Sequence, residues 1–354
     1  MLKNGLLLLT LIFSSFPLSV HVSAQQTSSP EDSEQWYHWT DDRVRHYVYS
    51  FGEAEAPGDT VVVLHGGWGA EHSYLIDPFI EPAKNHRFVF YDQRGSLRSP
   101  APDSLLTLEK LVSDLDHLRE MIGLETLNIA AHSMGNALAY AYLNPFPDRV
   151  ESLILIGPVL PAPFSSGSSL EFAKKVWPEV DSSQLIKDSQ EFMSNAYERA
   201  KQIALDEGFL PDSLKDTDPQ NIEIRNTGEG KTRTRVWRIF FTAVNTCSGE
   251  NWREMKGGQA FYNSDVAPAI FNNSPMDDVS EEFWPALQAF DGPIRVIIGT
   301  CDYVDVGPAI WPKAVQELDN AEISVIDGAG HSAWMDQPDA FNSALKDALN
   351  EVTE

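Results

Sequence analysis

Three side chains stand in sequence contexts that suit nucleophilic catalysis: Ser133, Asp302 and His331. Ser133 is the centre of the run AHSMG at 131–135, in which small residues flank the turn. A serine hydroxyl is a weak nucleophile, so it needs a histidine as general base and a carboxylate that orients the imidazole. Asp302 and His331 follow Ser133 in one of the chain orders in which such triads occur. These residues therefore predict a Ser–Asp–His catalytic triad.

Each of the three residues follows a stretch that predicts a buried strand. Continuous apolar runs of this length are typical of strands covered on both faces. They occupy residues 127–131 before Ser133, 294–298 before Asp302 and 323–326 before His331. Because the carboxyl ends of parallel strands meet at one edge of a sheet, we expect the three side chains at that edge.

Other residues compete for these roles. Asp305 is an alternative acid, although Asp302 stands closer to the end of its strand. His132 adjoins the serine but points elsewhere on the turn, and His65 lies in a glycine loop, whereas His331 is the only histidine in the last fifth of the chain. The plain alternative for the serine itself is an ordinary helix N-cap, because the short motif alone has low specificity.

A glycine loop stands where an oxyanion site would be needed. His65-Gly66-Gly67-Trp68-Gly69 follows the apolar run 60–64. Glycines let backbone N–H groups approach a ligand closely, and acyl transfer needs two such donors for the developing oxyanion. We expect the N–H groups of Gly67 and Met134 to serve, the alternative being a tight turn without function.

The elements around these residues predict an α/β fold with a mostly parallel central sheet covered by helices on both faces. The helix over 108–122 shows apolar residues at helical spacing, with Thr107 as N-cap and Gly123 as stop. Residues 160–288 break the alternation and predict a mainly helical cap between two parts of the core, 36–159 and 289–354. The expected strands are 60–64, 87–91, 127–131, 152–156, 294–298 and 323–326, and the other expected helices are 134–143, 308–318 and 338–350.

The first residues predict export. Lys3, the apolar run 6–16 and the small residues at 22–24 are typical of a signal peptide over residues 1–24, with an uncleaved anchor as the alternative. Residues 25–35 are polar and predict a flexible tail. We therefore expect a secreted or periplasmic protein with no stable membrane span after cleavage.

Net charge, cysteine count and motif spacing each argue against a class of partner or ligand. The formal net charge of −26 argues against nucleic acid. The chain has two cysteines, Cys247 and Cys301, which predict neither a disulfide scaffold nor a zinc cluster and leave open whether they pair. Metal-ligand spacings such as H-E-x-x-H do not occur, so we expect no metal and no cofactor.

Five motifs together resemble the proline iminopeptidase family of α/β-hydrolases. They are HGG at 65–67, DQRGSLRSP at 92–100, AHSMG at 131–135, GTCD at 299–302 and GAGH at 328–331, and the DQRG run is the most discriminating of them. The resemblance implies the α/β-hydrolase fold, the triad and oxyanion donors named above, and removal of N-terminal residues, often proline, from peptides. Within the DQRG run, we expect Asp92 and Arg94 to tie loops together by hydrogen bonds.

The resemblance also implies that acidic side chains of the cap hold the substrate's free α-amine. Trp68 and Leu97 depart from the family pattern, and their bulk near the pocket weakens the expected preference for proline. We expect a secreted serine aminopeptidase that acts on a small peptide or amino-acid derivative. A carboxylesterase or lactonase with the same triad, and a non-catalytic binding protein on the same fold, are the alternatives. The candidate cap acids, for most of which a solvated surface charge is the alternative, are Glu171, Glu179, Glu198, Glu250 and Glu254.

Overall fold

The computed structural model describes residues 32–54, 56–162, 168–256, 262–305 and 307–353. The expected signal peptide, residues 1–24, lies outside this part of the chain, as does the expected tail up to residue 31. Among the helices of the described residues, none combines the length and the apolar character that crossing a membrane requires.

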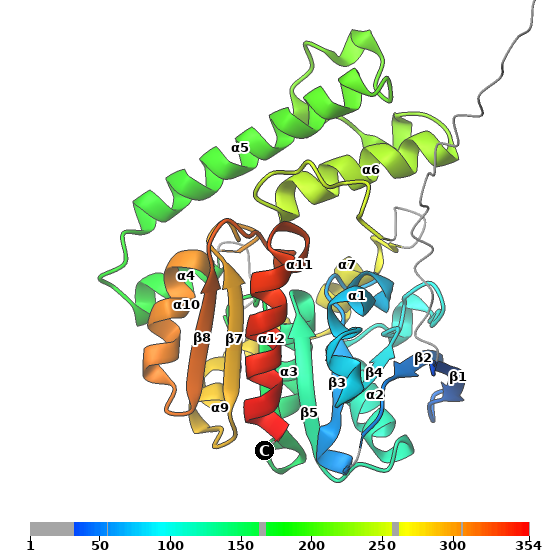
Figure 1. Ribbon diagram of the computed structural model, residues 1–354, viewed down its shortest axis with the longest axis vertical. Coiled ribbons are helices and arrows are strands. Elements are labelled where there is room, and N and C mark those ends of the chain that lie inside the picture. The colour runs from blue at the N-terminus through cyan, green and yellow to red at the C-terminus, as the bar shows by residue number, and fades with distance from the viewer. Residues whose placement is uncertain (1–31, 55, 163–167, 257–261, 306, 354) are drawn as a thin grey trace, which may run out of the picture.

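One eight-stranded sheet has the order β1-β2-β4-β3-β5-β6-β7-β8 (Figure 1). The pairs β1–β2 and β2–β4 are antiparallel, and the other neighbours are parallel. All six strands expected from the apolar runs are present, so the predicted fold class is confirmed. The strands are β1 (Glu34–Trp39), β2 (Arg45–Phe51), β3 (Thr60–Leu64), β4 (Arg87–Tyr91), β5 (Leu127–His132), β6 (Val150–Ile156), β7 (Ile294–Gly299) and β8 (Ala321–Ile326).

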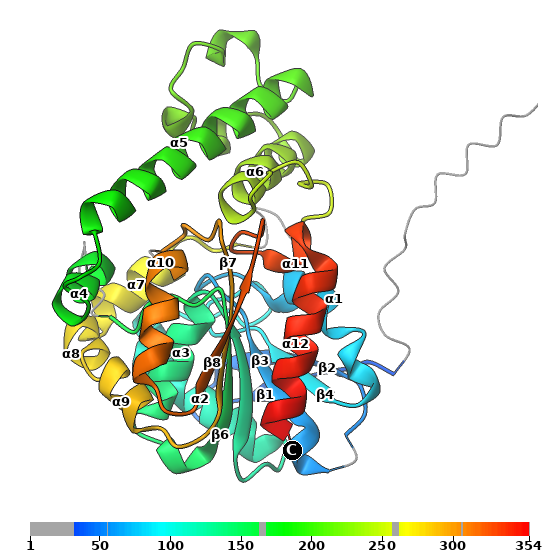
Figure 2. The same ribbon diagram turned by 60° about the vertical axis from the view of Figure 1, so that its left-hand side comes forward.

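Strand residues alternate between two hydrophobic layers, because successive side chains of a strand point to opposite faces. Val62 and Leu64 face the layer that holds α2, α3 and α10, whereas Val61 and Val63 face the layer that holds α1 and α12. Figure 2 shows the sheet between α12 on one side and α3 and α10 on the other. These helices are α1 (Ile76–Phe79), α2 (Leu108–Met121), α3 (Met134–Leu143), α10 (Gly307–Ala314) and α12 (Pro338–Thr353), and α11 (Ala333–Asp336) precedes the last of them.

Helix α2 begins and ends where the sequence predicts. The side chain of Thr107 accepts a hydrogen bond from the N–H of Lys110 at 3.2 Å, as an N-cap does. Gly123, just beyond the helix, has φ +77°, a left-handed conformation that glycine adopts at little cost.

The segment between β6 and β7 contributes two kinds of helix. The helices α5 and α6 stand above the carboxyl edge of the sheet (Figures 1 and 2) and share their own small core, in which Ala196 and Ala200 meet Val236 and Ile239. The remaining helices of the segment join the layer around α3 through residues such as Trp177, Ile270 and Phe283. In the described part of this segment, the α-helices are α4 (Ser168–Val176), α5 (Ser182–Asp206), α6 (Gly230–Asn245), α7 (Val266–Asn273), α8 (Met276–Ser280) and α9 (Phe283–Ala289).

The N-terminal hairpin corrects one expectation. Glu34 and Gln35, assigned to a flexible tail, begin β1, and neither β1 nor β2 is predicted from the apolar runs. β1 is an edge strand in which only His38 is fully buried, so it gives no continuous hydrophobic signal. Cross-strand contacts hold it instead, including Tyr37 against Tyr47 with ring centroids 5.3 Å apart.

Candidate active site

Ser133 occupies a tight turn between β5 and α3. Its φ of 55° and ψ of −126° are rare for a residue with a side chain. The turn passes so close to its neighbours that a Cβ on Gly66 would lie 2.5 Å from the Cβ of Ser133, and one on Gly135 would lie 2.5 Å from the carbonyl oxygen of Leu64. The Ser133 side chain makes no capping hydrogen bond to α3, so the N-cap alternative is not what the structure shows.

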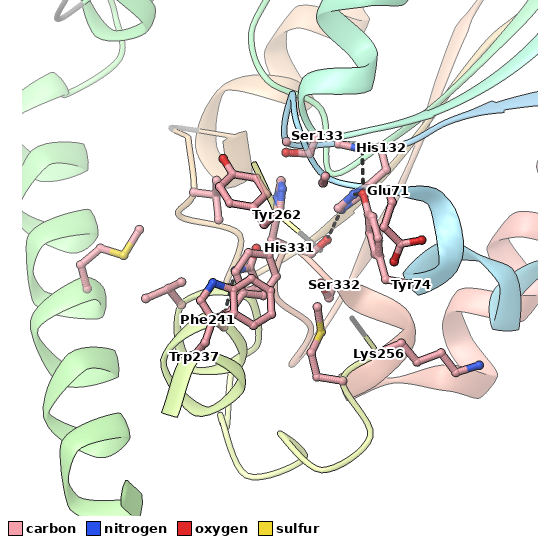
Figure 3. A pocket seen from close by; sticks show the side chains of 18 of the residues that line it. Glu71, Tyr74, His132, Ser133, Trp237, Phe241, Lys256, Tyr262, His331 and Ser332 are labelled. Atoms are coloured by element: carbon pink, nitrogen blue, oxygen red, sulfur yellow. Dashed lines mark hydrogen bonds between the residues drawn. The ribbon is translucent and has the colours of Figure 1, made fainter. Parts of the chain in front are cut away.

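Asp302 and His331, which lie far apart in the sequence, come together beyond β7 and β8. Nδ1 of His331 lies 2.9 Å from Oδ1 and 3.0 Å from Oδ2 of Asp302, and both side chains are buried. A proton on Nδ1 that is donated to this carboxylate leaves Nε2 as the basic nitrogen. Among the described residues, Nε2 of His331 has no hydrogen-bond partner. His331 and Ser133 line the same cavity (Figure 3).

The competing acid and bases have other partners. Asp305 accepts hydrogen bonds from the N–H of Leu160 at 2.8 Å and from the hydroxyl of Ser169 at 3.3 Å. Nε2 of His65 accepts a hydrogen bond from the N–H of Gln93 at 3.1 Å, which ties two loops together. The structure therefore pairs Asp302, and not Asp305, with His331.

His132 belongs to a chain of hydrogen bonds beside Ser133 and His331 that the sequence motifs do not reveal. The N–H of Gly66 donates to the hydroxyl of Tyr74 at 2.7 Å, and this hydroxyl lies 2.9 Å from Nδ1 of His132. Nε2 of His132 lies 3.1 Å from the carbonyl oxygen of His331. Burial lowers the pKa of His132 well below its ordinary value, so the ring is neutral, accepting from Tyr74 and donating to His331. The glycine loop and the His331 loop are thereby joined.

Both expected oxyanion donors stand near the serine. Gly67, with φ +62°, lines the cavity, and Met134 is the first residue of α3, whose N–H groups point out of the helix N-terminus. Within the described residues, neither backbone N–H has a protein acceptor. Their part in catalysis stays a prediction.

The DQRG run forms the ties expected of it, and extends them. Asp92 accepts from Nδ1 of His72 at 2.6 Å and from Nε of Arg98 at 2.8 Å, which links the loops after β3 and β4. Burial alone would raise the pKa of Asp92, but the hydrogen bond from His72 and the charge of Arg98 outweigh it and lower the pKa to about 2. Arg94 binds both oxygens of Asp114 on α2 at 2.6 Å, so it fastens a helix to the loop.

One group of side chains has metal-ligand character. Ligand atoms of Glu71, His72 and Asp92 lie within 4.8 Å of one another. The guanidinium of Arg98 already contacts both carboxylates, so the cation held by this cluster is an arginine.

The cavity at Ser133 measures about 250 Å³ and is mostly apolar. Helix α6 contributes Trp237 and Phe241, whose rings stack with centroids 4.6 Å apart (Figure 3). Glu71 is the one acidic residue among the described lining residues, and its carboxylate accepts hydrogen bonds from Ser73 and Arg98. The other apolar lining residues include Met193, Tyr197, Val244, Met255, Tyr262 and Val304.

One expectation about the pocket is wrong, that Trp68 and Leu97 lie near it, and another stays a prediction. The candidate cap acids are all exposed and outside the described lining of the cavity, which agrees with the alternative of solvated surface charges: Glu171, Glu179, Glu198, Glu250 and Glu254. Trp68 and Leu97 do not reach it either: Trp68 is 1% exposed in the core, with its ring centroid 5.6 Å from that of Phe271, and Leu97 is 50% exposed on the surface. Sequence spacing cannot tell which face of a helix or loop turns toward the serine.

The two cysteines, whose pairing the sequence leaves open, form a disulfide between Cys247 and Cys301.

Known proteins with similar sequences or folds share this architecture. The model of the alpha/beta hydrolase family matches residues 61–344. A proline iminopeptidase of Lactobacillus delbrueckii subsp. lactis is 25% identical over 316 residues, which are 86% of this chain and 94% of the relative. A proline iminopeptidase of Heyndrickxia coagulans is 36% identical over 108 residues, covering 30% of this chain and 37% of the relative.

Solved structures show the same fold with different activities in their names. A proline iminopeptidase-related protein of Thermus thermophilus superposes with a TM-score of 0.58 at 23% identity, covering 91% of this chain and 98% of that one. A thermophilic esterase of Thermogutta terrifontis has a TM-score of 0.57 at 17% identity, covering 91% and 100%. The resemblance to proline iminopeptidases expected from the motifs is confirmed by these similarities.

Proposed function

Because the chain belongs to the alpha/beta hydrolase family, we propose that it is a serine hydrolase in which Ser133, His331 and Asp302 form the catalytic triad. The observation that carries the proposal is the buried Asp302–His331 pair, whose free Nε2 belongs to the same cavity as the strained Ser133. If Ser133 had only a structural role, its strained backbone, the buried Asp302–His331 pair and the unpartnered imidazole nitrogen would have no explanation.

The proposed reaction passes through an acyl-enzyme. The Ser133 hydroxyl attacks the substrate carbonyl while Nε2 of His331 takes its proton, and Asp302 stabilises the imidazolium. The N–H groups of Gly67 and Met134 hold the oxyanion. His331 returns the proton to the leaving amine or alcohol as the carbonyl re-forms. Water, deprotonated by the same nitrogen, then attacks the ester to Ser133, and collapse of that intermediate releases the acid.

For the substrate, we propose an N-terminal residue of a small peptide, cleaved in the manner of a proline iminopeptidase. Relatives with that name, about a quarter identical to this chain over more than four-fifths of its length, support this specificity. The apolar cavity suits an uncharged side chain. Export is part of the proposal, supported by the N-terminal sequence and by a disulfide, since such bonds persist in oxidising compartments.

A carboxylesterase is the second candidate, and a specific observation favours it. None of the five cap glutamates lines the described cavity, and Glu71 is already paired with Arg98. The described site therefore has no unpaired carboxylate that could bind the free amine of a substrate.

The deciding experiment compares free and N-acetylated prolyl and phenylalanyl naphthylamides with p-nitrophenyl butyrate. An aminopeptidase loses activity when the amine is blocked, whereas an esterase cleaves the butyrate fastest and is indifferent to blocking. The control is Ser133→Ala, which should lower every rate by a factor of about 10⁴ or more while the circular dichroism spectrum stays unchanged. Full activity in that variant, or no labelling of the wild type by a fluorophosphonate, would refute the triad.

A further inference from the structure

The end of helix α6 meets the two loops that carry Asp302 and His331. Cys247 lies two residues beyond the last residue of α6, and Cys301 immediately precedes Asp302. The disulfide between them joins the α6 end covalently to the Asp302 loop.

Hydrogen bonds join the same α6 end to the His331 loop. The N–H of Ser332 donates to the carbonyl oxygen of Asn245 at 2.7 Å. Oδ2 of Asp336 accepts from the N–H of Cys247 at 2.8 Å and from that of Gly330 at 2.9 Å. The backbones are in such close contact that a Cβ on Gly330 would lie 2.7 Å from the Cα of Thr246.

The carboxylate of Asp302 makes few hydrogen bonds within the described part of the chain. Among the described residues, the only group that donates a hydrogen bond to it is His331. The backbone of its own loop is held at the preceding residue, where the N–H of Cys301 donates to the carbonyl oxygen of Ala329 at 2.8 Å and the sulfur is bonded to Cys247.

Helix α6 also lines the cavity at Ser133. Trp237, Phe241, Val244 and Asn245 all line the cavity, from the middle of the helix to its last residue. Figure 3 shows Trp237 and Phe241 on the side of the cavity that α6 forms. The junction is thus a direct mechanical connection between the helix that lines the binding site and the acid–base pair.

We propose that the Cys247–Cys301 disulfide is a positioning element for the triad: it holds Asp302 against His331 and keeps α6 in place over Ser133. The proposal rests on the proposed serine hydrolase function. Without the bond, the hydrogen bonds that remain between the Asp302 loop and the end of α6 within the described residues run through the His331 loop, and we expect the Asp302–His331 pair to be held less firmly. Small displacements of a catalytic group have large effects on rate, so the bond matters for turnover as well as for stability.

The test uses the full-length chain with both cysteines replaced, Cys247→Ser/Cys301→Ser, and p-nitrophenyl butyrate or the best naphthylamide as substrate. We expect kcat to fall by about tenfold or more at a temperature where the variant remains folded. A lower melting temperature with unchanged kcat would overturn the proposal.

A double-mutant cycle tests whether the bond acts through Asp302. In an Asp302→Ala background, removal of the disulfide should cost much less in kcat than it costs in the wild type, since the group that it positions is gone. Equal losses in both backgrounds would show that the bond acts elsewhere.

Reduction of the folded wild-type protein gives the same comparison without refolding a variant. Both cysteines are partly exposed, so we expect a phosphine reductant to lower kcat reversibly. The disulfide-free variant is the matched control and should not respond; retention of full kcat by the reduced protein would count against the proposal. Failure of the wild type to hydrolyse any substrate or to take up a fluorophosphonate would instead refute the serine hydrolase function itself.

Discussion

At the scale of single residues, the site is built from backbone positions that tolerate almost no side-chain volume. Ser133 sits at φ 55°, a conformation that costs about 1 to 3 kcal/mol for a residue with a Cβ. The surrounding packing, with Gly66 and Gly135 in close contact, holds this strain in place. This strained conformation directs the serine side chain to the cavity. At an unstrained helix start, the same side chain would cap the helix.

Gly157, which directly follows β6, lies against the Asp302–His331 pair. It has φ +46°, and a Cβ there would lie 3.0 Å from Nδ1 of His331 and 3.1 Å from Oδ2 of Asp302. We expect Gly157→Ala to separate the pair and lower kcat by about ten- to a hundredfold.

Gly123→Ala is the matched control for that experiment. Gly123 also has a positive φ, of +77°, but no atom lies within 4 Å of its added Cβ. This variant should lose about 1 kcal/mol of unfolding free energy and keep its activity. Equal kcat losses in both variants would mean that backbone strain, and not contact with the triad, is responsible.

At the scale of elements, the strands position the candidate catalytic residues, and helices of the segment between β6 and β7 form much of the binding surface. The strands β5, β7 and β8 are parallel, so they end at one edge of the sheet, where the three residues of the proposed triad follow them. Helices α5 and α6 supply much of the binding surface above that edge, and their mutual packing is largely separate from the two layers of the core.

We therefore expect substitutions on the cavity face of α6 to change binding more than chemistry. Trp237→Ala removes part of the apolar lining and should raise KM by about tenfold, which corresponds to about 1.4 kcal/mol of lost apolar contact. Steady-state kinetics with the preferred substrate measures it, with the exposed Lys231→Ala on the same helix as control. A change in kcat with constant KM would show that Trp237 does not contribute to substrate binding.

At the scale of the whole molecule, buried histidines make stability depend on pH. His38, in the N-terminal hairpin, packs between His46 and His117 with ring centroids 5.2 and 5.4 Å away. Burial, together with the charges that these neighbours can carry, lowers the pKa of His38 from 6.5 to about 4, although Asp114 opposes the shift. As pH falls, the unfolded chain takes up this proton first, so stability decreases between pH 6.5 and about 4.

His38→Phe should remove this contribution. Between pH 7 and pH 5 the wild type is expected to lose about 2 kcal/mol more unfolding free energy than the variant. Urea unfolding at the two pH values measures the difference, and the exposed Trp39→Phe on the same strand serves as control. The same pH dependence in wild type and His38→Phe would show that other groups govern acid stability.

The sequence by itself determined most of the sheet and the positions of the candidate catalytic residues along it. Apolar runs locate β3 to β8 because strands buried on both faces need continuous hydrophobic stretches, and Ser133, Asp302 and His331 follow such runs at the shared edge. It did not reveal β1 or β2. β1 is an edge strand with one buried residue, held by cross-strand pairs, and β2 is mostly buried but its sequence RHYVYSF mixes polar with apolar residues, so neither forms a continuous apolar run.

Only the tertiary structure decided what surrounds the serine. The directions of Trp68, Leu97 and the cap glutamates follow from how helices and loops pack, which no local spacing specifies. The same holds for the Tyr74–His132 hydrogen bonds and for the Cys247–Cys301 bond, whose partners are 58 and 54 residues apart. Contacts at such separations exist only once the sheet has brought its loops to one edge, which is why the sequence could place the candidate residues at that edge but not the shape of the pocket around them.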